Sequence, residues 1–396
     1  MSIKANNITK VALIQFFSTL YFYLPILTIY YQQRGLNFIQ INSLWGIITG
    51  TIFLAEVPTG IIADKIGRKK SIIIALILQL IGEIFFLFSQ NYLHFIFISV
   101  IAGLGFAFQS GCIQALVYDS LKEENKENTM KQASGKIGAF YQTGHVLGAL
   151  ASSFIVTQLT QYRITLAIIF TIISVGIALF ISFLLKEPKS QYRHGEQNPT
   201  KLFSEVMNLI RNNTSLKRII LLGVFTTPFV GYMRNLHPPY FQLSGVAPFW
   251  LGITLAVGGI LGAFASKYAY KMEELFGVGK GMYIATILPA IFYFLMALIL
   301  SPVFAIVFFV FNFGLMNIQE PLFADYYNRH IKSEVRATTL SAINMISSFY
   351  IALIGLMIGW IANYSILYAF IFMGVIIFLG ATLFRINESH TRIAKT

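Results

Sequence analysis

The sequence predicts an all-α membrane protein with twelve transmembrane helices in two pseudo-symmetric six-helix bundles. The chain is 56% hydrophobic and only 11% charged, whereas soluble domains carry about 25% charged residues. Its apolar residues fall into runs of about 20, the length that crosses a bilayer as a helix. Its basic residues gather between alternate runs. Together these three patterns indicate repeated crossing of a membrane.

Twelve apolar runs follow the polar segment Met1–Lys10, which has no small-residue cleavage site, so we expect the first run to be retained. Two turns are short, Ser89–Asn91 and Ser301–Pro302, and the count depends on them. The expected spans cover residues 10–31, 41–63, 71–90, 92–119, 133–159, 164–186, 217–241, 248–270, 281–300, 302–325, 337–362 and 364–386.

The basic residues predict the orientation. If the N-terminus is cytoplasmic, 25 of the 29 Lys and Arg residues lie on the cytoplasmic side, as the positive-inside rule requires. Both termini are then cytoplasmic. An anionic leaflet, rather than nucleic acid, accounts for the net charge of +13. The Ile- and Asn-rich composition favours a bacterial inner membrane.

Two halves are expected. The longest polar segment, 187–216, is interpreted as a cytoplasmic linker between an N-terminal bundle, 1–186, and a C-terminal bundle, 217–396. Related sequences recur in the two halves: Tyr30–Gly35 resembles Tyr240–Gly245, and Ile113-Gln114 matches Ile318-Gln319. Duplicated halves of this kind bind substrate near the midplane between them.

One motif lies between the second and third spans. It reads Gly60-Ile61-Ile62-Ala63-Asp64-Lys65-Ile66-Gly67-Arg68-Lys69-Lys70. In spacing and location it resembles the signature loop of the major facilitator superfamily of secondary transporters. A weaker echo, Glu274-Leu275-Phe276-Gly277, follows the eighth span.

The resemblance implies a conformational latch. Gly60 would permit close helix approach, and Asp64 would cap the positive end of span eleven, near Glu334. Arg68 would pair with Asp119 at the end of span four, after the turn at Gly67. The alternative is that this basic motif only anchors the loop at the lipid headgroups.

Other motifs of drug antiporters are incomplete. Gly103 and Gly105 are present in span four, but Ser99 stands in place of the expected arginine. In span five His145 replaces a proline, so plain helix packing is the favoured interpretation of the neighbouring glycines, which are Gly135, Gly138, Gly144 and Gly148. The direction of transport therefore stays open.

Charged groups inside spans are functional candidates because a bilayer makes them costly. Glu56, Glu83, Arg234 and Glu320 are such groups. The resemblance implies that spans one, four, seven and ten line the cavity, which favours Arg234 and Glu320. We expect Glu56 or Glu320, not Glu83, to carry a coupled proton, and Glu83 to have a buried structural partner.

Four uncharged or weakly basic residues complete the candidate set. His145 titrates near neutral pH in its unperturbed form, although a hydrogen-bonded packing role is the alternative. Gln114, Tyr118 and Gln319 are expected either to contact substrate or to form interhelical hydrogen bonds.

The predicted function is proton-coupled efflux of an amphipathic small molecule. The alternative is uptake or export of a metabolite or siderophore by the same fold. Nucleotide-binding and hydrolase motifs are missing from the sequence, so a membrane enzyme, a channel and a receptor are less favoured. We expect no cofactor, no metal site and a monomer, with the substrate, protons and the lipid bilayer as partners.

Overall fold

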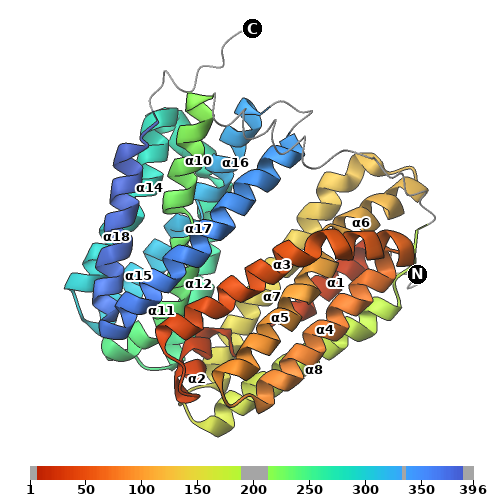
Figure 1. Ribbon diagram of the computed structural model, residues 1–396, viewed down its shortest axis with the longest axis horizontal. Helices are drawn as coiled ribbons and strands as arrows, with labels where there is room; N and C mark the ends of the chain where they lie inside the picture. Colours follow the sequence, from red (N-terminus) through yellow and green to blue (C-terminus); the bar gives the residue numbers. More distant parts are fainter. Residues whose placement is uncertain (1–6, 189–212, 332–335, 387–396) are drawn as a thin grey trace. The chain divides into compact units, whose positions relative to one another are not determined.

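The computed structural model describes residues 7–188, 213–331 and 336–386, and these residues are almost entirely helical (Figure 1). Within them, ten helical segments are long and apolar enough to cross a membrane. The predicted linker, 187–216, and both chain ends lie largely outside the described residues.

The described helices form two compact units. The N-terminal bundle contains α1 to α8 and the C-terminal bundle α10 to α18, except that residues 37–43 group with the second unit and 251–256 with the first. The helices of the N-terminal bundle are α1 (Asn7–Ser18), α2 (Leu27–Gln33), α3 (Phe38–Ile66), α4 (Arg68–Phe88), α5 (Tyr92–Gln109), α6 (Cys112–Glu123), α7 (Met130–Ile155) and α8 (Gln161–Phe183).

The C-terminal bundle is built from comparable pieces. Its helices are α10 (Thr214–Thr226), α11 (Phe229–Leu243), α12 (Phe249–Lys267), α13 (Ala269–Phe276), α14 (Val278–Leu298), α15 (Pro302–Met316), α16 (Gln319–His330), α17 (Arg336–Tyr364) and α18 (Ile366–Leu383). The pairs α1–α2, α5–α6, α10–α11 and α15–α16 each make one span.

The prediction of twelve spans is confirmed when the paired helices are joined. Ten of the spans meet the length and composition test directly. The remaining two are the pair α1–α2, whose pieces are short, and α7, whose sequence is comparatively polar. Both short turns on which the count depended are present, because α4 ends at Phe88 and α14 ends at Leu298.

The two bundles repeat one packing scheme. In the N-terminal bundle α4 packs on α5 and α8, and α1 packs on α7 and α8. In the C-terminal bundle α14 packs on α15 and α18, and α10 packs on α17 and α18. The same span positions therefore meet in each half, as a duplicated six-helix unit requires.

The ends of α2 and α11 give a second sign of duplication. Gly35 has a φ of 81° and Gly245 a φ of 72°, in the left-handed region that glycine adopts without strain. The N–H of Gly35 bonds to the carbonyl of Gln32, and that of Gly245 to Gln242. The following residues bond five positions back, so both helices end in the same Schellman motif. The sequence similarity of these two segments thus has a structural counterpart.

Spans one, four, seven and ten are all interrupted. The interruptions lie between Ser18 and Leu24, at Ser110-Gly111, at Thr227-Pro228 and at Asn317-Ile318. The sequence analysis gave only the ranges of these spans and did not identify the interruptions. Discontinuous helices in corresponding positions of two halves are the usual sign of a transporter's binding region.

The break in span one has a local cause. Pro25 has no N–H and its ring clashes with the carbonyl four residues earlier, which weakens a helix at this place. Thr19 turns its hydroxyl back to the carbonyl of Gln15 at 2.7 Å, which offers that carbonyl a partner other than a helical N–H. A 3₁₀ turn, Leu24–Ile26, then leads into α2.

Neighbouring helices satisfy the backbone groups that this break releases. Ser174 on α8 donates to the carbonyl of Phe17 at 2.8 Å, and Gln79 on α4 donates to that of Ser18 at 2.9 Å. The N–H of Phe22 donates to the hydroxyl of Thr171 at 3.1 Å. Broken backbone is tolerated at membrane depth only with such partners.

The other breaks have equally simple causes. Gly111 has a φ of 71°, in the left-handed region, and this backbone turn separates α5 from α6. Pro228 follows Thr227 and cannot donate to the preceding turn. Pro321 leaves the carbonyl of Asn317 without a helical partner, and Ser266 on α12 donates to that carbonyl at 2.8 Å.

Candidate functional site

The carboxylates inside spans lie beside the helix breaks. Glu56 on α3 accepts a long hydrogen bond, 3.5 Å, from Ser110 at the break in span four. Glu83 on α4 accepts a hydrogen bond from Tyr23 at the break in span one, at 2.8 Å. Glu320 lies in the first turn of α16, directly after the break in span ten. Each of the three acids therefore lies next to an interruption in a membrane-spanning helix.

The C-terminal bundle contains a cavity of about 410 Å³ beside its two breaks. Thr227 from span seven and both Asn317 and Glu320 from span ten contribute to its wall. A cavity of this size is within the range of small-molecule sites. The remaining lining residues are Gly223, Val230, Met316, Gln319, Phe323, Ala324, Tyr327, Leu340, Ile343, Asn344 and Ser347.

The structure brings two of the predicted site residues together in this cavity, Gln319 and Glu320. Glu320 is exposed, whereas Gln319 is buried and also donates to the carbonyl of Ala285 on α14 at 3.1 Å. Arg234 lies half-buried on α11 and is not among the lining residues of the cavity. A direct pairing of Arg234 with Glu320 stays a prediction.

The other candidates lie in the N-terminal bundle. Gln114 and Tyr118 are exposed and lie one turn apart on α6. His145 is half-buried on α7, and its ring meets the edge of Tyr141 with centroids 4.8 Å apart. Across the described residues, no group of three His, Cys, Asp or Glu residues has the geometry of a metal site.

The signature motif is not an extended loop. Asp64 still belongs to α3 and Arg68 already belongs to α4, so Gly67 alone connects the two helices. Gly67 achieves this with a φ of 97° and a ψ of 159°. Gly277, in the echo motif, joins α13 to α14 with nearly the same angles, 73° and 166°. The second glycine of the motif is therefore a one-residue turn in both halves.

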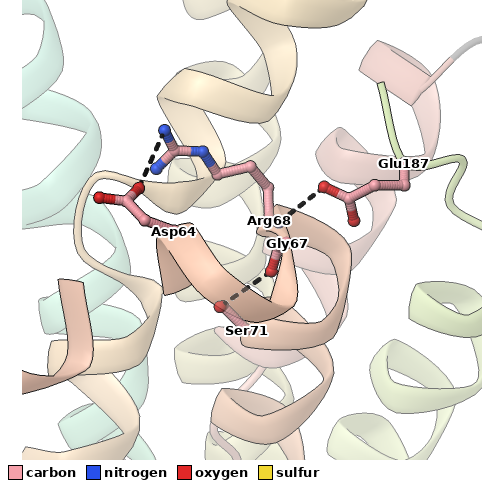
Figure 2. A network of polar contacts seen from close by, with 5 residues as sticks. All are labelled: Asp64, Gly67, Arg68, Ser71 and Glu187. Carbon is pink, nitrogen blue, oxygen red and sulfur yellow. Dashed lines mark hydrogen bonds and ion pairs between the residues drawn. The ribbon is translucent and has the colours of Figure 1, made fainter. Parts of the chain in front are cut away.

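A carboxylate caps the helix that starts after this turn (Figure 2). Glu187, which follows α8, accepts hydrogen bonds from the backbone N–H of Arg68 at 2.7 Å and of Lys69 at 2.8 Å. These N–H groups have no partner within α4, and the positive end of the helix favours a negative charge. A Cβ at Gly67 would lie 2.8 Å from the Glu187 carboxyl carbon, so the cap needs glycine there.

Two residues of the predicted latch, Asp64 and Arg68, contact each other. Arg68 forms an ion pair with Asp64 one turn away, at 3.5 Å. Asp119 is half-buried near the end of α6, and its predicted pairing with Arg68 stays a prediction. A Cβ at Gly60 would meet no atom within 4 Å. The expected partner of Asp64 near Glu334 lies outside the described residues.

Sequence reasoning missed Glu187 and the tyrosines at the first break. Glu187 was assigned to the linker, and only its three-dimensional approach to α4 identifies its role. Tyr21 and Tyr23 were not among the candidate site residues. Their position shortly before Pro25 was the available signal, because a proline within an apolar span kinks or breaks a helix.

Comparisons with known proteins agree with this architecture. A family model described as Major Facilitator Superfamily matches residues 11–355. The chain is 21% identical over 386 residues to an uncharacterised MFS-type transporter, YxaM, of Bacillus subtilis (strain 168), and the match covers 94% of each chain. It is 28% identical over 196 residues to Multidrug resistance protein 2 of the same organism, covering 48% of this chain and 46% of the relative.

Solved structures give the same result for the fold. A variant of the nucleoside transporter NupG superposes with a TM-score of 0.81, covering 98% of this chain and 100% of that chain. The sequence identity between the two is 12%, so this likeness shows the fold alone.

Proposed function

Because this chain belongs to the Major Facilitator Superfamily, we propose that it exports an amphipathic small molecule in exchange for protons, by alternating access. Members of this family are secondary transporters, not enzymes. The similarity to Multidrug resistance protein 2 supports an efflux role. The aromatic content of the chain, 15%, suits a substrate with a large apolar surface.

The observation that carries the proposal is the cavity beside the breaks of spans seven and ten. It combines apolar walls, such as Val230 and Phe323, with one carboxylate, Glu320. A mostly apolar pocket with few polar groups is the usual construction of a small-molecule site. The negative charge of Glu320 would attract a cationic substrate, accept a neutral one and repel an anionic one.

The same carboxylate is our first candidate for coupling. A carboxylate in a cavity that opens alternately to the two sides of the membrane can take up a proton on one side and release it on the other. Substrate and proton would then compete for Glu320. Glu56, at the break in span four, is the second candidate.

A second function is favoured by the polar part of the same wall. Asn317, Asn344 and Ser347 could hydrogen-bond a polar metabolite or a siderophore. Such a substrate could move in either direction through the same fold. The NupG variant, a nucleoside transporter by its description, is a structural neighbour, but it bears on the fold alone.

The topology completes the proposal. Multiple apolar helices make this a multi-pass membrane protein. We place it as a monomer in a bacterial inner membrane with both termini in the cytoplasm, because 25 of 29 basic residues then lie on that side. A reporter that is active only outside the cytoplasm should be silent when fused after Thr396.

The test is transport by the purified protein in proteoliposomes. A panel of amphipathic cations, nucleosides and siderophores is first screened for ligands that raise the melting temperature. A ligand found in this way should accumulate against its gradient when a proton gradient is imposed, and a protonophore should stop the accumulation. Accumulation that depends on sodium and survives the protonophore would overturn proton coupling. Accumulation of only polar metabolites would favour the second function.

A further inference from the structure

Glu83 is a buried acid inside the N-terminal bundle. It is 7% exposed, and its Oε2 atom accepts a hydrogen bond from the Tyr23 hydroxyl at 2.8 Å. Among the described residues, no Lys, Arg or His forms an ion pair with it. The structural partner expected from the sequence is therefore a phenol and not a cation.

The polar groups nearest to this carboxyl group are uncharged and come from the first span, from α4 and from α7. The Tyr21 hydroxyl lies beside it and accepts a hydrogen bond from Nε2 of Gln79 at 2.9 Å. Tyr31 on α2 and Tyr141 on α7 are the next titratable neighbours in this cluster. Phenols are uncharged at neutral pH, so none of these groups could balance a negative charge.

Aromatic packing closes the enclosure. The Tyr23 ring stacks on Phe86 with centroids 4.8 Å apart, and it meets the edge of Tyr21 at 5.6 Å. Tyr23 is 6% exposed and Phe86 is 3% exposed. In this conformation of span one, the packed rings of Tyr23 and Phe86 keep bulk water away from Glu83.

Burial without a cation favours a neutral carboxylic acid at Glu83. An ionised carboxylate in this enclosure would have neither a cation nor bulk water to compensate the cost of burying its charge. A protonated carboxyl group is both a donor and an acceptor. Tyr23 donates to one of its oxygens, and the oxygen of Tyr21 can accept from its O–H.

We propose that Glu83, Tyr21, Tyr23 and Gln79 form a proton-binding site at the break in span one, separate from the cavity that contains Glu320. The bound proton leaves when the break opens to water: the O–H bond of Glu83 breaks, the proton passes to a water molecule, and the carboxylate becomes hydrated. The N-terminal bundle thus has its own protonation site, whichever substrate the protein carries.

Infrared difference spectroscopy on the purified protein in nanodiscs tests the site directly. At neutral pH the wild type should show the carbonyl band of a protonated carboxylic acid, shifted in heavy water and missing in Glu83→Gln. The amide keeps the acceptor for Tyr23, so this variant should fold. Glu320→Gln is the matched control and should retain the band. A spectrum in which Glu83→Gln removes only ionised-carboxylate bands would overturn the proposal.

A second variant tests the site if Glu83→Gln does not fold. Tyr23→Phe removes the hydrogen bond to the carbonyl oxygen, so the acid band should move to higher frequency. A band that does not move would mean that Tyr23 faces no protonated acid, which contradicts the proposal. Sodium chloride added at constant pH should leave the band unchanged, and its loss would make this a sodium site instead.

Discussion

The carboxylate of Glu187 accepts the backbone N–H of Arg68 at 2.7 Å, at a distance of 119 residues along the chain. This contact joins the end of α8 to the start of α4. It lies at the turn made by Gly67, whose missing side chain leaves the space that the carboxylate fills. The signature glycine is thus required for both its backbone angles and its small size.

Gly67→Ala should therefore destabilise the protein by about 1–3 kcal/mol, the usual cost of a non-glycine residue in strained backbone, with the clash against Glu187 added. The apparent melting temperature in detergent measures the effect. Gly35→Ala is the matched control, because Gly35 also has a positive φ, 81°, but no atom within 4 Å of a Cβ. It should cost less than Gly67→Ala.

Glu187→Ala should lower the free energy of unfolding by about 1 kcal/mol, as the loss of a helix cap does. In the double variant with Gly67→Ala the two effects should not add, because the clash is gone once the carboxylate is removed. Strict additivity in this cycle would show that Glu187 does not fill the space beside Gly67.

The ion pair of Asp64 and Arg68 is expected to matter for transport rather than for stability. A partly exposed pair one turn apart on adjoining helices contributes less than about 1 kcal/mol to folding. Asp64→Asn and Arg68→Ala should nevertheless reduce transport about tenfold or more, the size of a typical coupling between conformational states. Arg68→Lys should also be impaired, because a point charge cannot replace the planar guanidinium.

Transport assays and membrane-insertion assays on the same variants separate the two effects. Lys126→Ala is the control, since it removes a different ion pair, Lys126–Glu124, at 2.9 Å. That variant should transport normally. Native transport rates in both Asp64→Asn and Arg68→Ala would exclude a latch.

Replacing the coupling acid should separate uphill from downhill transport. Glu320→Gln, or else Glu56→Gln, should lose accumulation against a gradient but keep counterflow, because a permanently neutral side chain can still bind substrate but no longer exchange a proton. Glu83→Gln should still concentrate substrate, since we expect the coupled proton to be carried by Glu320 or Glu56 and not by Glu83. If only Glu83→Gln uncoupled transport, the coupled proton would have been assigned to the wrong carboxyl group.

The glycines of α7 should differ sharply in tolerance. A Cβ at Gly144 would lie 2.5 Å from the carbonyl oxygen of Phe16, and one at Gly148 would lie 2.9 Å from that of Tyr21. Gly144→Ala and Gly148→Ala should each destabilise the protein by about 1–3 kcal/mol, as overpacking does. Thermal unfolding in detergent measures both.

Gly138→Ala on the same helix serves as the comparison, because no atom lies within 4 Å of its Cβ position. It should be neutral, or stabilising by up to about 1 kcal/mol through helix propensity. Equal effects at Gly138 and Gly144 would show that α7 does not pack closely on the first span.

Much of this fold follows from the sequence because lipid imposes simple rules. Runs of apolar residues and the positions of basic residues were sufficient for the number of spans and the two halves. Close helix packing was favoured for four glycines of α7. It is found at Gly144 and Gly148 but not at Gly135 and Gly138, where no atom lies within 4 Å of a Cβ position. The motif between spans two and three was identified from Asp64, Gly67 and Arg68 in their spacing.

The interruptions and the cap were harder to predict. Hydropathy averages over about 20 residues, so it does not register a break of a few residues such as that between Ser18 and Leu24. Pro25 and Pro228 were local signals of interruption, but prolines such as Pro58 lie inside continuous α3. Glu187 acts across the fold, and nothing near it in the sequence indicates the helix that it caps.

Because Gly67 is the only residue between α3 and α4, no flexible loop allows the two helices to move independently. Any change in the tilt of α3 must either rotate the two backbone dihedrals of Gly67 or displace the first turn of α4. Since Glu187 holds that turn to the end of α8, such a displacement would also pull on the chain that leaves the N-terminal bundle. Span two, span three and the exit from span six are therefore mechanically linked through one peptide unit and one carboxylate.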